Sequence, residues 1–109
     1  MNLIKRSTID EFARTHPRAA NALADWVAMV RAARWTTPIE LEATSVFPAR
    51  PIGGDRVIFN IHGNDFRLIC SVVYARTDPP PRTGAVYVKF WGTHAEYDRV
   101  DAHTVEFRE

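Results

Sequence analysis

The sequence predicts an α+β domain in which helices cover one face of a small antiparallel sheet. Apolar residues recur every three or four positions in the first half of the chain and alternate with polar residues in the second half. A segment rich in proline and glycine, residues 46–55, separates the two patterns. The 109 residues, 46% of them hydrophobic, suit a single domain, residues 1–109, with one core.

The chain is expected to begin with a short strand, followed by a first helix. Residues 1–5 are the predicted strand. Ser7 is a good N-cap residue, and Asp10 follows three positions later, as in a capping box. The helix that they open should end near Thr15.

Two further helices are predicted before the breaker-rich segment. Pro17 suits the first turn of a second helix, where its missing N–H is not needed. Residues 19–33 carry the apolar stripe of that helix. Thr37, Pro38 and Glu40 then form a capped start, and the helix that they open must be short because residue 46 already begins the next loop.

The second half predicts three strands and a closing helix. The strands are expected at residues 57–61, 66–76 and 85–91. A four-residue turn, 62–65, joins the first two, and three consecutive prolines, 79–81, interrupt the chain before the third. Thr93 should cap a last helix that runs from His94 to about Asp101.

Alternation along the strands divides their side chains between two faces. Val86, Val88 and Phe90 should face the core, together with Phe66, Leu68, Cys70, Val72 and Tyr74. Arg67, Tyr87, Lys89 and Trp91 should lie on the opposite face, left open to solvent or to a ligand. Such residues can simply decorate a solvated sheet, but rings that stack on bases and cations that neutralise phosphates also suit single-stranded nucleic acid.

The formal net charge of +1 conceals an uneven distribution. Residues 50–94 contain six basic and three acidic residues, whereas residues 95–109 contain two basic and five acidic ones. The centre of the chain is therefore basic and its end acidic. The acidic end could pair with the basic face, but we expect it to be solvated.

His94 and Tyr97 form the clearest candidate reactive pair. They lie three residues apart, so they share one side of the last helix at its N-terminal turn. A histidine titrates near neutral pH, and a tyrosine hydroxyl can orient or donate a proton. An ordinary capped helix whose tyrosine packs on the sheet is the alternative.

Several other classes of site are not expected. No His, Cys or carboxylate residues repeat at ligand spacing, so we expect no metal and no cofactor. The single cysteine, Cys70, lies on the predicted core face, which is a poor place for a nucleophile. The apolar runs are too short for a membrane span, and one cysteine suits a reducing compartment, so a cytoplasmic location is the default.

Two segments resemble the HigB-type toxins, a branch of the RelE-like bacterial toxins. They are NIHGNDFRLI at residues 60–69 and YVKFWGTHAEYD at residues 87–98. The second block, with its Thr-His-x-Glu-Tyr-Asp ending, is the more specific of the two. The resemblance extends over nearly the whole chain, although family members often carry a second glycine where this chain has His62.

The resemblance implies the toxin of a type II toxin-antitoxin system. Such a protein is a small cytoplasmic endoribonuclease that cleaves messenger RNA on the translating ribosome. The 2′-hydroxyl of the RNA attacks the adjacent phosphate, without a metal. The partners implied are mRNA, the ribosome and a cognate helix-turn-helix antitoxin of the HigA type.

This chemistry requires a base, an acid and cations for the developing phosphorane charge. The expected charge stabilisers are Arg67 and Lys89, and the expected groups for proton transfer or base stacking are His94 and Tyr97, with their roles undivided. The expected RNA-binding residues are Arg56, Asn64, Tyr87 and Trp91. The alternative is a non-catalytic RNA- or protein-binding module on the same fold, since a basic, aromatic face can bind without cutting.

Overall fold

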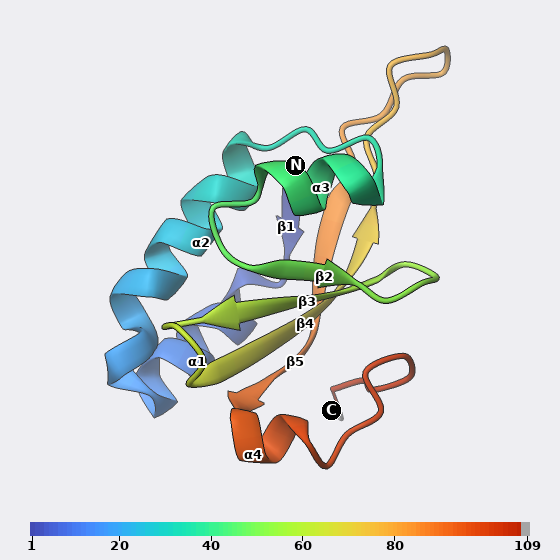
Figure 1. Cartoon of the computed structure of the whole chain (residues 1–109). Coiled ribbons are helices and arrows are strands. Elements are labelled where there is room, and N and C mark those ends of the chain that lie inside the picture. Colours follow the sequence, from blue (N-terminus) through green and yellow to red (C-terminus); the bar gives the residue numbers. More distant parts are fainter. Residues whose placement is uncertain (108–109) are drawn as a thin grey trace.

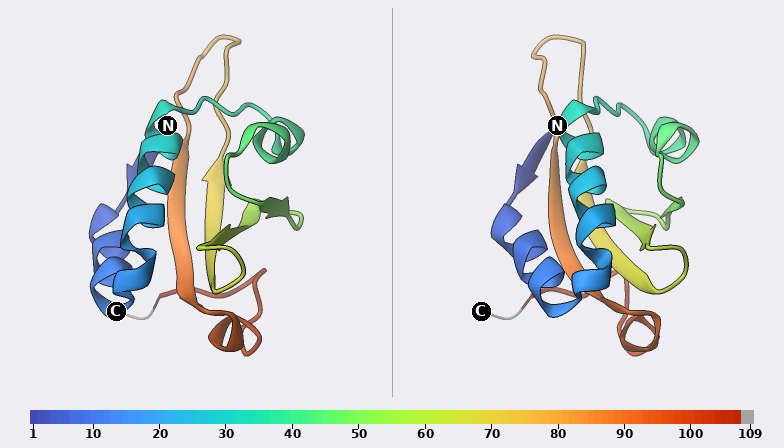
Figure 2. Two further views of the ribbon diagram at one scale, coloured as in Figure 1. Left: turned by 60° about the vertical axis from the view of Figure 1, so that its left-hand side comes forward. Right: turned by 90° about the vertical axis from the view of Figure 1, so that its left-hand side faces the viewer.

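The computed structural model describes residues 1–107, and its helices and strands follow the predicted order with one additional strand (Figure 1). In chain order the elements are β1 (Asn2–Ile4), α1 (Arg6–Thr15), a 3-10 turn (Pro17–Ala19), α2 (Ala20–Ala32), α3 (Pro38–Thr44), β2 (Ala49–Pro51), β3 (Arg56–Ile61), β4 (Phe66–Val73), β5 (Ala85–Thr93) and α4 (His94–Tyr97). Figure 2 shows α1 and α2 side by side on one face of the sheet. The α+β class is confirmed.

The sheet has five strands in the order β1-β5-β4-β3-β2. β3, β4 and β5 form the predicted antiparallel meander, with β4 ending at Val73 rather than Arg76. β1 pairs in parallel with β5, so the sheet is mixed rather than wholly antiparallel. β2 lies in the segment that was expected to be a loop, and it pairs antiparallel with β3. It ends at Pro51, whose missing backbone N–H an edge strand tolerates.

The predicted helix starts are correct for α3 and wrong for α1. Thr37 caps α3, and its side-chain oxygen accepts a hydrogen bond from the backbone N–H of Glu40 at 3.1 Å. At α1 the expected cap Ser7 is wrong. The N-cap is Lys5, in a left-handed conformation with φ 57° and without a side-chain cap, so the helix begins at Arg6 and Ser7 lies inside its first turn.

One hydrophobic core fills the space between the helices and the sheet. Phe66, Leu68, Cys70 and Val72 of β4 are buried in it as predicted, and Tyr74 packs against it. Burial raises the pKa of the Cys70 thiol, so this residue is an inert part of the core. The largest fully buried side chains are Trp26, Phe12, Phe59, Phe66, Leu23, Leu41, Ile61, Leu68, Ile69, Val30, Val57 and Val86.

A β-bulge at Lys89 interrupts the pairing of β4 with β5. Ile69 pairs with Phe90 and Cys70 pairs with Val88, which leaves Lys89 as the extra residue of β5. An inserted residue shifts the alternation of faces by one position. Val88, before the bulge, faces the core, whereas Phe90, after it, pairs with Ile69 on the opposite side, so the prediction that Phe90 faces the core is wrong.

The prediction that Trp91 shares an open face with Tyr87 is therefore wrong. Trp91 lies opposite Leu68 and packs against the core, and its ring stacks on Phe12 with 5.0 Å between the ring centroids. Tyr87, before the bulge, stays exposed at 38%. Simple alternation could not separate the two residues because it does not account for an inserted residue.

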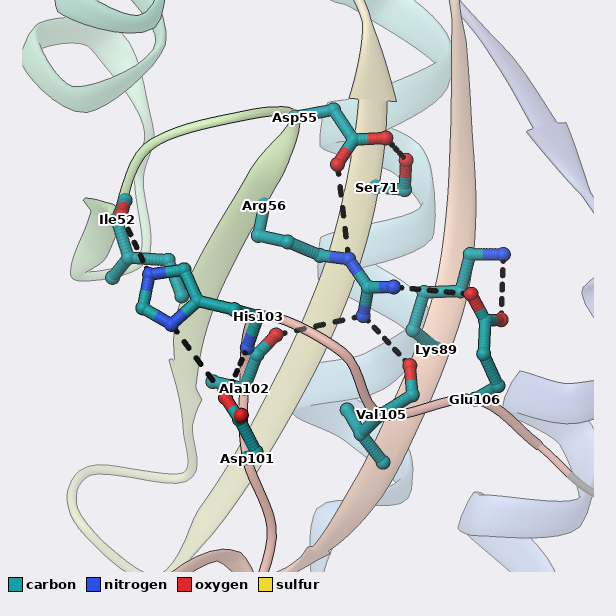
Figure 3. A network of polar contacts seen from close by, with 10 residues as sticks. All are labelled: Ile52, Asp55, Arg56, Ser71, Lys89, Asp101, Ala102, His103, Val105 and Glu106. Atoms are coloured by element: carbon teal, nitrogen blue, oxygen red, sulfur yellow. Dashed lines mark hydrogen bonds and ion pairs between the residues drawn. The ribbon is translucent and has the colours of Figure 1, made fainter.

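The sheet face away from α1 and α2 is not open along its whole length. The segment that follows α4 crosses it (Figures 1 and 3). The Arg56 guanidinium donates hydrogen bonds to the Val105 carbonyl at 2.7 Å and to the Glu106 carboxylate at 3.1 Å. The expectation of a solvated acidic end is therefore wrong for Glu106, which pairs with the basic face, whereas Glu96, Asp98 and Asp101 are exposed as expected; residues 108 and 109 lie outside the described residues.

The last helix is shorter than predicted but is capped as predicted. α4 ends at Tyr97, not near Asp101. The Thr93 hydroxyl accepts from the Glu96 N–H at 3.2 Å, while the Glu96 carboxylate accepts from the Thr93 N–H at 2.9 Å, which completes a capping box. The backbone hydrogen bond from Thr93 holds the pKa of Glu96 below its ordinary value.

Because the bulge places Trp91 in the core and leaves Tyr87 exposed, truncating the two aromatic side chains should destabilise the protein to different degrees. Trp91→Ala removes a ring that packs on Phe12, and we expect a loss of about 2–4 kcal/mol in the free energy of unfolding. Tyr87→Ala, the matched control on the exposed side, should cost less than about 1 kcal/mol. Urea denaturation measures both changes, and equal losses would contradict the bulged register.

The Glu96 cap predicts a pH-dependent contribution to stability. Because folding lowers the pKa of Glu96, its contribution is complete above the unfolded value of about 4.3 and disappears as the pH falls through the folded value. Glu96→Gln should therefore be less stable than wild type near neutral pH, with a gap that narrows below about pH 4. Thermal unfolding at several pH values measures the gap, Glu42→Gln on α3 is the control, and a constant gap would contradict the assignment.

Candidate functional site

A cavity of about 340 Å³ lies where β2, β3, β4 and α4 meet. It brings together three of the four residues predicted to be catalytic, namely Arg67, His94 and Tyr97. It also adds Arg50 and Asn60, which the sequence did not single out. The full lining is Pro48, Ala49, Arg50, Ile58, Asn60, Arg67, His94 and Tyr97.

Arg67 is a buried cation whose position is fixed by the turn before it. Its side chain is only 8% exposed. The guanidinium donates to the backbone carbonyls of Asn64 and Phe66, both at 3.2 Å, and to the Asn64 side-chain oxygen. A charge taken out of water needs such acceptors, and they fix the orientation of the planar group. On its other side the guanidinium lies 5.7 Å from the centre of the Tyr97 ring.

His94 and Tyr97 come from the single turn of α4. Their ring centres are 6.2 Å apart. The His94 Nδ1 atom lies 3.3 Å from the Asp98 carboxylate, and the His94 side chain is 46% exposed. The Tyr97 hydroxyl accepts a hydrogen bond of 3.4 Å from Arg50, an exposed residue of β2. The two titratable side chains are thus each held by a partner of opposite or complementary charge.

The turn between β3 and β4 connects these parts. His62 and Gly63 both have positive φ, 55° and 64°, a backbone conformation that favours glycine. A 2.9 Å contact of the His62 ring with Asp65 offsets part of the cost of the positive φ at His62. The Asp65 carbonyl in turn accepts from the backbone N–H of His94 at 3.1 Å. This hydrogen bond ties the start of α4 to the turn between β3 and β4, at one end of the interior strands of the sheet.

The other predicted site residues lie elsewhere. Lys89 lies outside the cavity lining, where it donates to Glu106 at 2.8 Å and lies 5.9 Å from the Tyr87 ring. Asn64 does not line the cavity, but its side-chain oxygen accepts a hydrogen bond from Arg67. Arg56 lies under the segment that follows α4, and Trp91 is on the core side of the sheet.

Asn60 could have been found from the sequence. A four-residue turn at 62–65 sets Ile61 opposite Phe66, which places Asn60 beside Arg67 on the same face, as the structure has it. Arg50 gave no such signal. It stands between two prolines in a segment typical of a loop, and only the pairing of β2 with β3 brings it to the cavity.

Two further classes of site receive no support from residues 1–107. They contain no group of three or more His, Cys, Asp or Glu residues placed to hold a metal ion. None of their helices is long and apolar enough to cross a membrane.

Comparison with known proteins identifies the family. A comparison with curated proteins gave no match. The family model of the HigB toxin, described as the RelE-like toxic component of a toxin-antitoxin system, matches residues 19–100. The match covers most of the chain and includes every residue that lines the cavity. It ends before the segment that reaches Arg56. The chain therefore belongs to the HigB toxin family, the RelE-like toxic components of toxin-antitoxin systems, and has an antitoxin as its partner.

Proposed function

We propose that this toxin is an endoribonuclease that cleaves messenger RNA on the translating ribosome by attack of the 2′-hydroxyl on the adjacent phosphodiester. The observation that carries the proposal is the convergence of two arginines, a histidine and a tyrosine on one cavity, Arg50, Arg67, His94 and Tyr97. Cations, a titratable ring and a hydroxyl are the groups that this reaction needs, and it needs no metal.

The two arginines have different tasks. Arg67 is buried and held by Asn64, so its charge is already in place when the phosphorane forms, and a fixed charge costs no reorganisation during the reaction. Arg50 is exposed on β2, and its guanidinium can bind a phosphate through two parallel hydrogen bonds. Arg50 binds the incoming phosphate, and Arg67 stabilises the charge that develops on it.

His94 is the general base of the proposed reaction. The Asp98 carboxylate lies 3.3 Å from Nδ1 of His94 and favours a proton on that nitrogen, which leaves Nε2 as the nitrogen that can take the proton of the 2′-hydroxyl. The same carboxylate stabilises the imidazolium that results, as in other histidine–carboxylate pairs. The exposure of the ring lets a substrate approach it.

Tyr97 is the candidate proton donor to the leaving 5′-oxygen. Its hydroxyl is held by Arg50, and its ring covers the Arg67 guanidinium. The hydrogen bond from Arg50 fixes the position of this hydroxyl at the cavity. The same ring also offers a surface on which a base can stack.

The ribosome supplies the substrate in this proposal. A net charge of +1 gives the protein little long-range attraction for RNA, so an assembly that already holds the messenger compensates for weak binding. A helix-turn-helix antitoxin of the HigA type is the proposed form of the antitoxin partner, and the cytoplasm is the proposed location.

Arg67→Ala and His94→Ala are expected to abolish growth inhibition, since each removes a group worth about 100-fold or more in rate. Arg14→Ala, an exposed arginine of α1 far from the cavity in sequence, should stay toxic. The measurement is the growth of induced cultures at matched protein levels. Circular dichroism melts of the purified variants control for folding, because Arg67 is buried and hydrogen-bonded.

Two outcomes would reject the proposal. Both variants could remain as toxic as wild type at matched expression, which would remove the cavity from the mechanism. Cleavage by the purified toxin on translating ribosomes could be abolished by EDTA and restored by magnesium while the ribosomes stay intact, which would reject 2′-hydroxyl attack without metal. If the protein binds RNA without cutting it, and its toxicity does not change in Arg67→Ala or His94→Ala, it is a binding module instead.

A further inference from the structure

A second cationic site lies on the same sheet face as the cavity. Arg56 on β3 and Lys89 at the bulge of β5 both reach the carboxylate of Glu106 (Figure 3). Arg56 Nη2 lies 3.1 Å from one carboxylate oxygen, and Lys89 Nζ lies 2.8 Å from the other. One anion is therefore clamped between two cations that come from different strands.

The cationic half of this site is built into the fold. Arg56 is only 8% exposed, and its guanidinium also donates to the backbone carbonyls of Val105 and, at 3.5 Å, Ala102. Asp55, next in sequence, lies 3.7 Å from its Nε atom. Lys89 owes its position to the bulge, because it is the inserted residue of β5. Both cations thus stand at fixed places on the sheet.

The anionic group, Glu106, by contrast, belongs to a segment that makes few polar contacts with the sheet. Residues 98–107 form turns but no helix or strand. Besides Glu106 and the two carbonyls at Arg56, the polar contacts of these residues are local turns, ion pairs of Asp98 and Asp101 with nearby histidines, and a 2.9 Å contact of His103 with the Ile52 carbonyl. The Glu106 carboxylate is about half exposed, and the hydrogen bond from Lys89 holds its pKa below the ordinary value. The segment therefore presents a charged carboxylate that a stronger anion can replace.

We propose that Arg56 and Lys89 form a subsite for a backbone phosphate of the RNA and that Glu106 occupies this subsite in the free protein. The ligand is a phosphodiester because one anion bridged by a guanidinium and an ammonium is the arrangement that a phosphate also adopts. Glu106 stands in for that phosphate. The inference rests on the proposed function, which supplies the RNA.

The place of the subsite suits an RNA strand that runs from the cavity. Arg56 and Asn60 lie on the same face of β3, four residues apart, which corresponds to about 13 Å along a strand. Asn60 lines the cavity beside Arg67. A strand whose reacting phosphate lies at Arg67 therefore reaches Arg56 and Lys89 with a phosphate further along the same strand.

The test measures RNA binding without cleavage. The probe is a short single-stranded RNA in which every 2′-hydroxyl is methylated, so that attack is impossible while all phosphates remain. Glu106→Gln should bind it about threefold or more tightly at low salt, with a slope of log affinity against log salt that is steeper by about 0.7, the value of one added phosphate contact. Fluorescence anisotropy measures both quantities.

Glu42→Gln is the matched control, because it makes the same change of net charge on an exposed position of α3. It should leave the salt slope at the wild-type value. Adding Lys89→Gln to Glu106→Gln should return the affinity and the slope to wild type. Thermal melts of all variants show that the domain is folded.

The inference is overturned if Glu106→Gln behaves like Glu42→Gln, or if the gain persists without Lys89. Either result leaves the cavity and its proposed cleavage untouched, since those are tested at Arg67 and His94. Conversely, a toxin that does not cleave RNA but gains affinity through Glu106→Gln would reject the cleavage proposal and support the subsite.

Discussion

The bulge at Lys89 is the constraint on which the arrangement of this protein depends. It turns Trp91 into the core, where the indole stacks on Phe12. Because the shift carries through to the end of β5, Gly92 lies opposite Arg67 and the chain then enters α4. A side chain at Gly92 would come within 2.9 Å of Phe90 and 3.1 Å of Glu96, so glycine lets β5 and the capped helix approach one another. The Tyr97 ring consequently lies against the Arg67 guanidinium, and His94 lines the same cavity.

The same insertion also gives the sheet face its second cationic position. Lys89, which would otherwise continue the ladder, pairs with Glu106 from the end of the chain. One face of the sheet thus carries two places where an anion is favoured, an accessible cavity around Arg67 and a site already filled by a carboxylate. This arrangement explains how a chain with a net charge of +1 contains a locally basic surface.

Local chemistry made much of the fold predictable from the sequence. The Thr37 and Thr93 caps, the meander and the burial of Cys70 follow from patterns a few residues long. The predictions that were wrong or missing concern residues whose positions depend on tertiary structure. Arg50 reaches the cavity only through an edge strand in a proline-rich segment, and the covered state of Arg56 depends on a segment about fifty residues away. Trp91 was misplaced because one inserted residue reverses a period of two.

We propose that this toxin cuts messenger RNA with the groups around Arg67. Mapping the 5′ ends of cellular RNA after induction tests it most directly, with wild type and Arg67→Ala compared at equal protein levels. Wild type is expected to give discrete new 5′ ends inside translated regions, in phase with the reading frame, and the variant none. Growth arrest by wild type without new ends in messenger RNA, or the same ends in both samples, would contradict it.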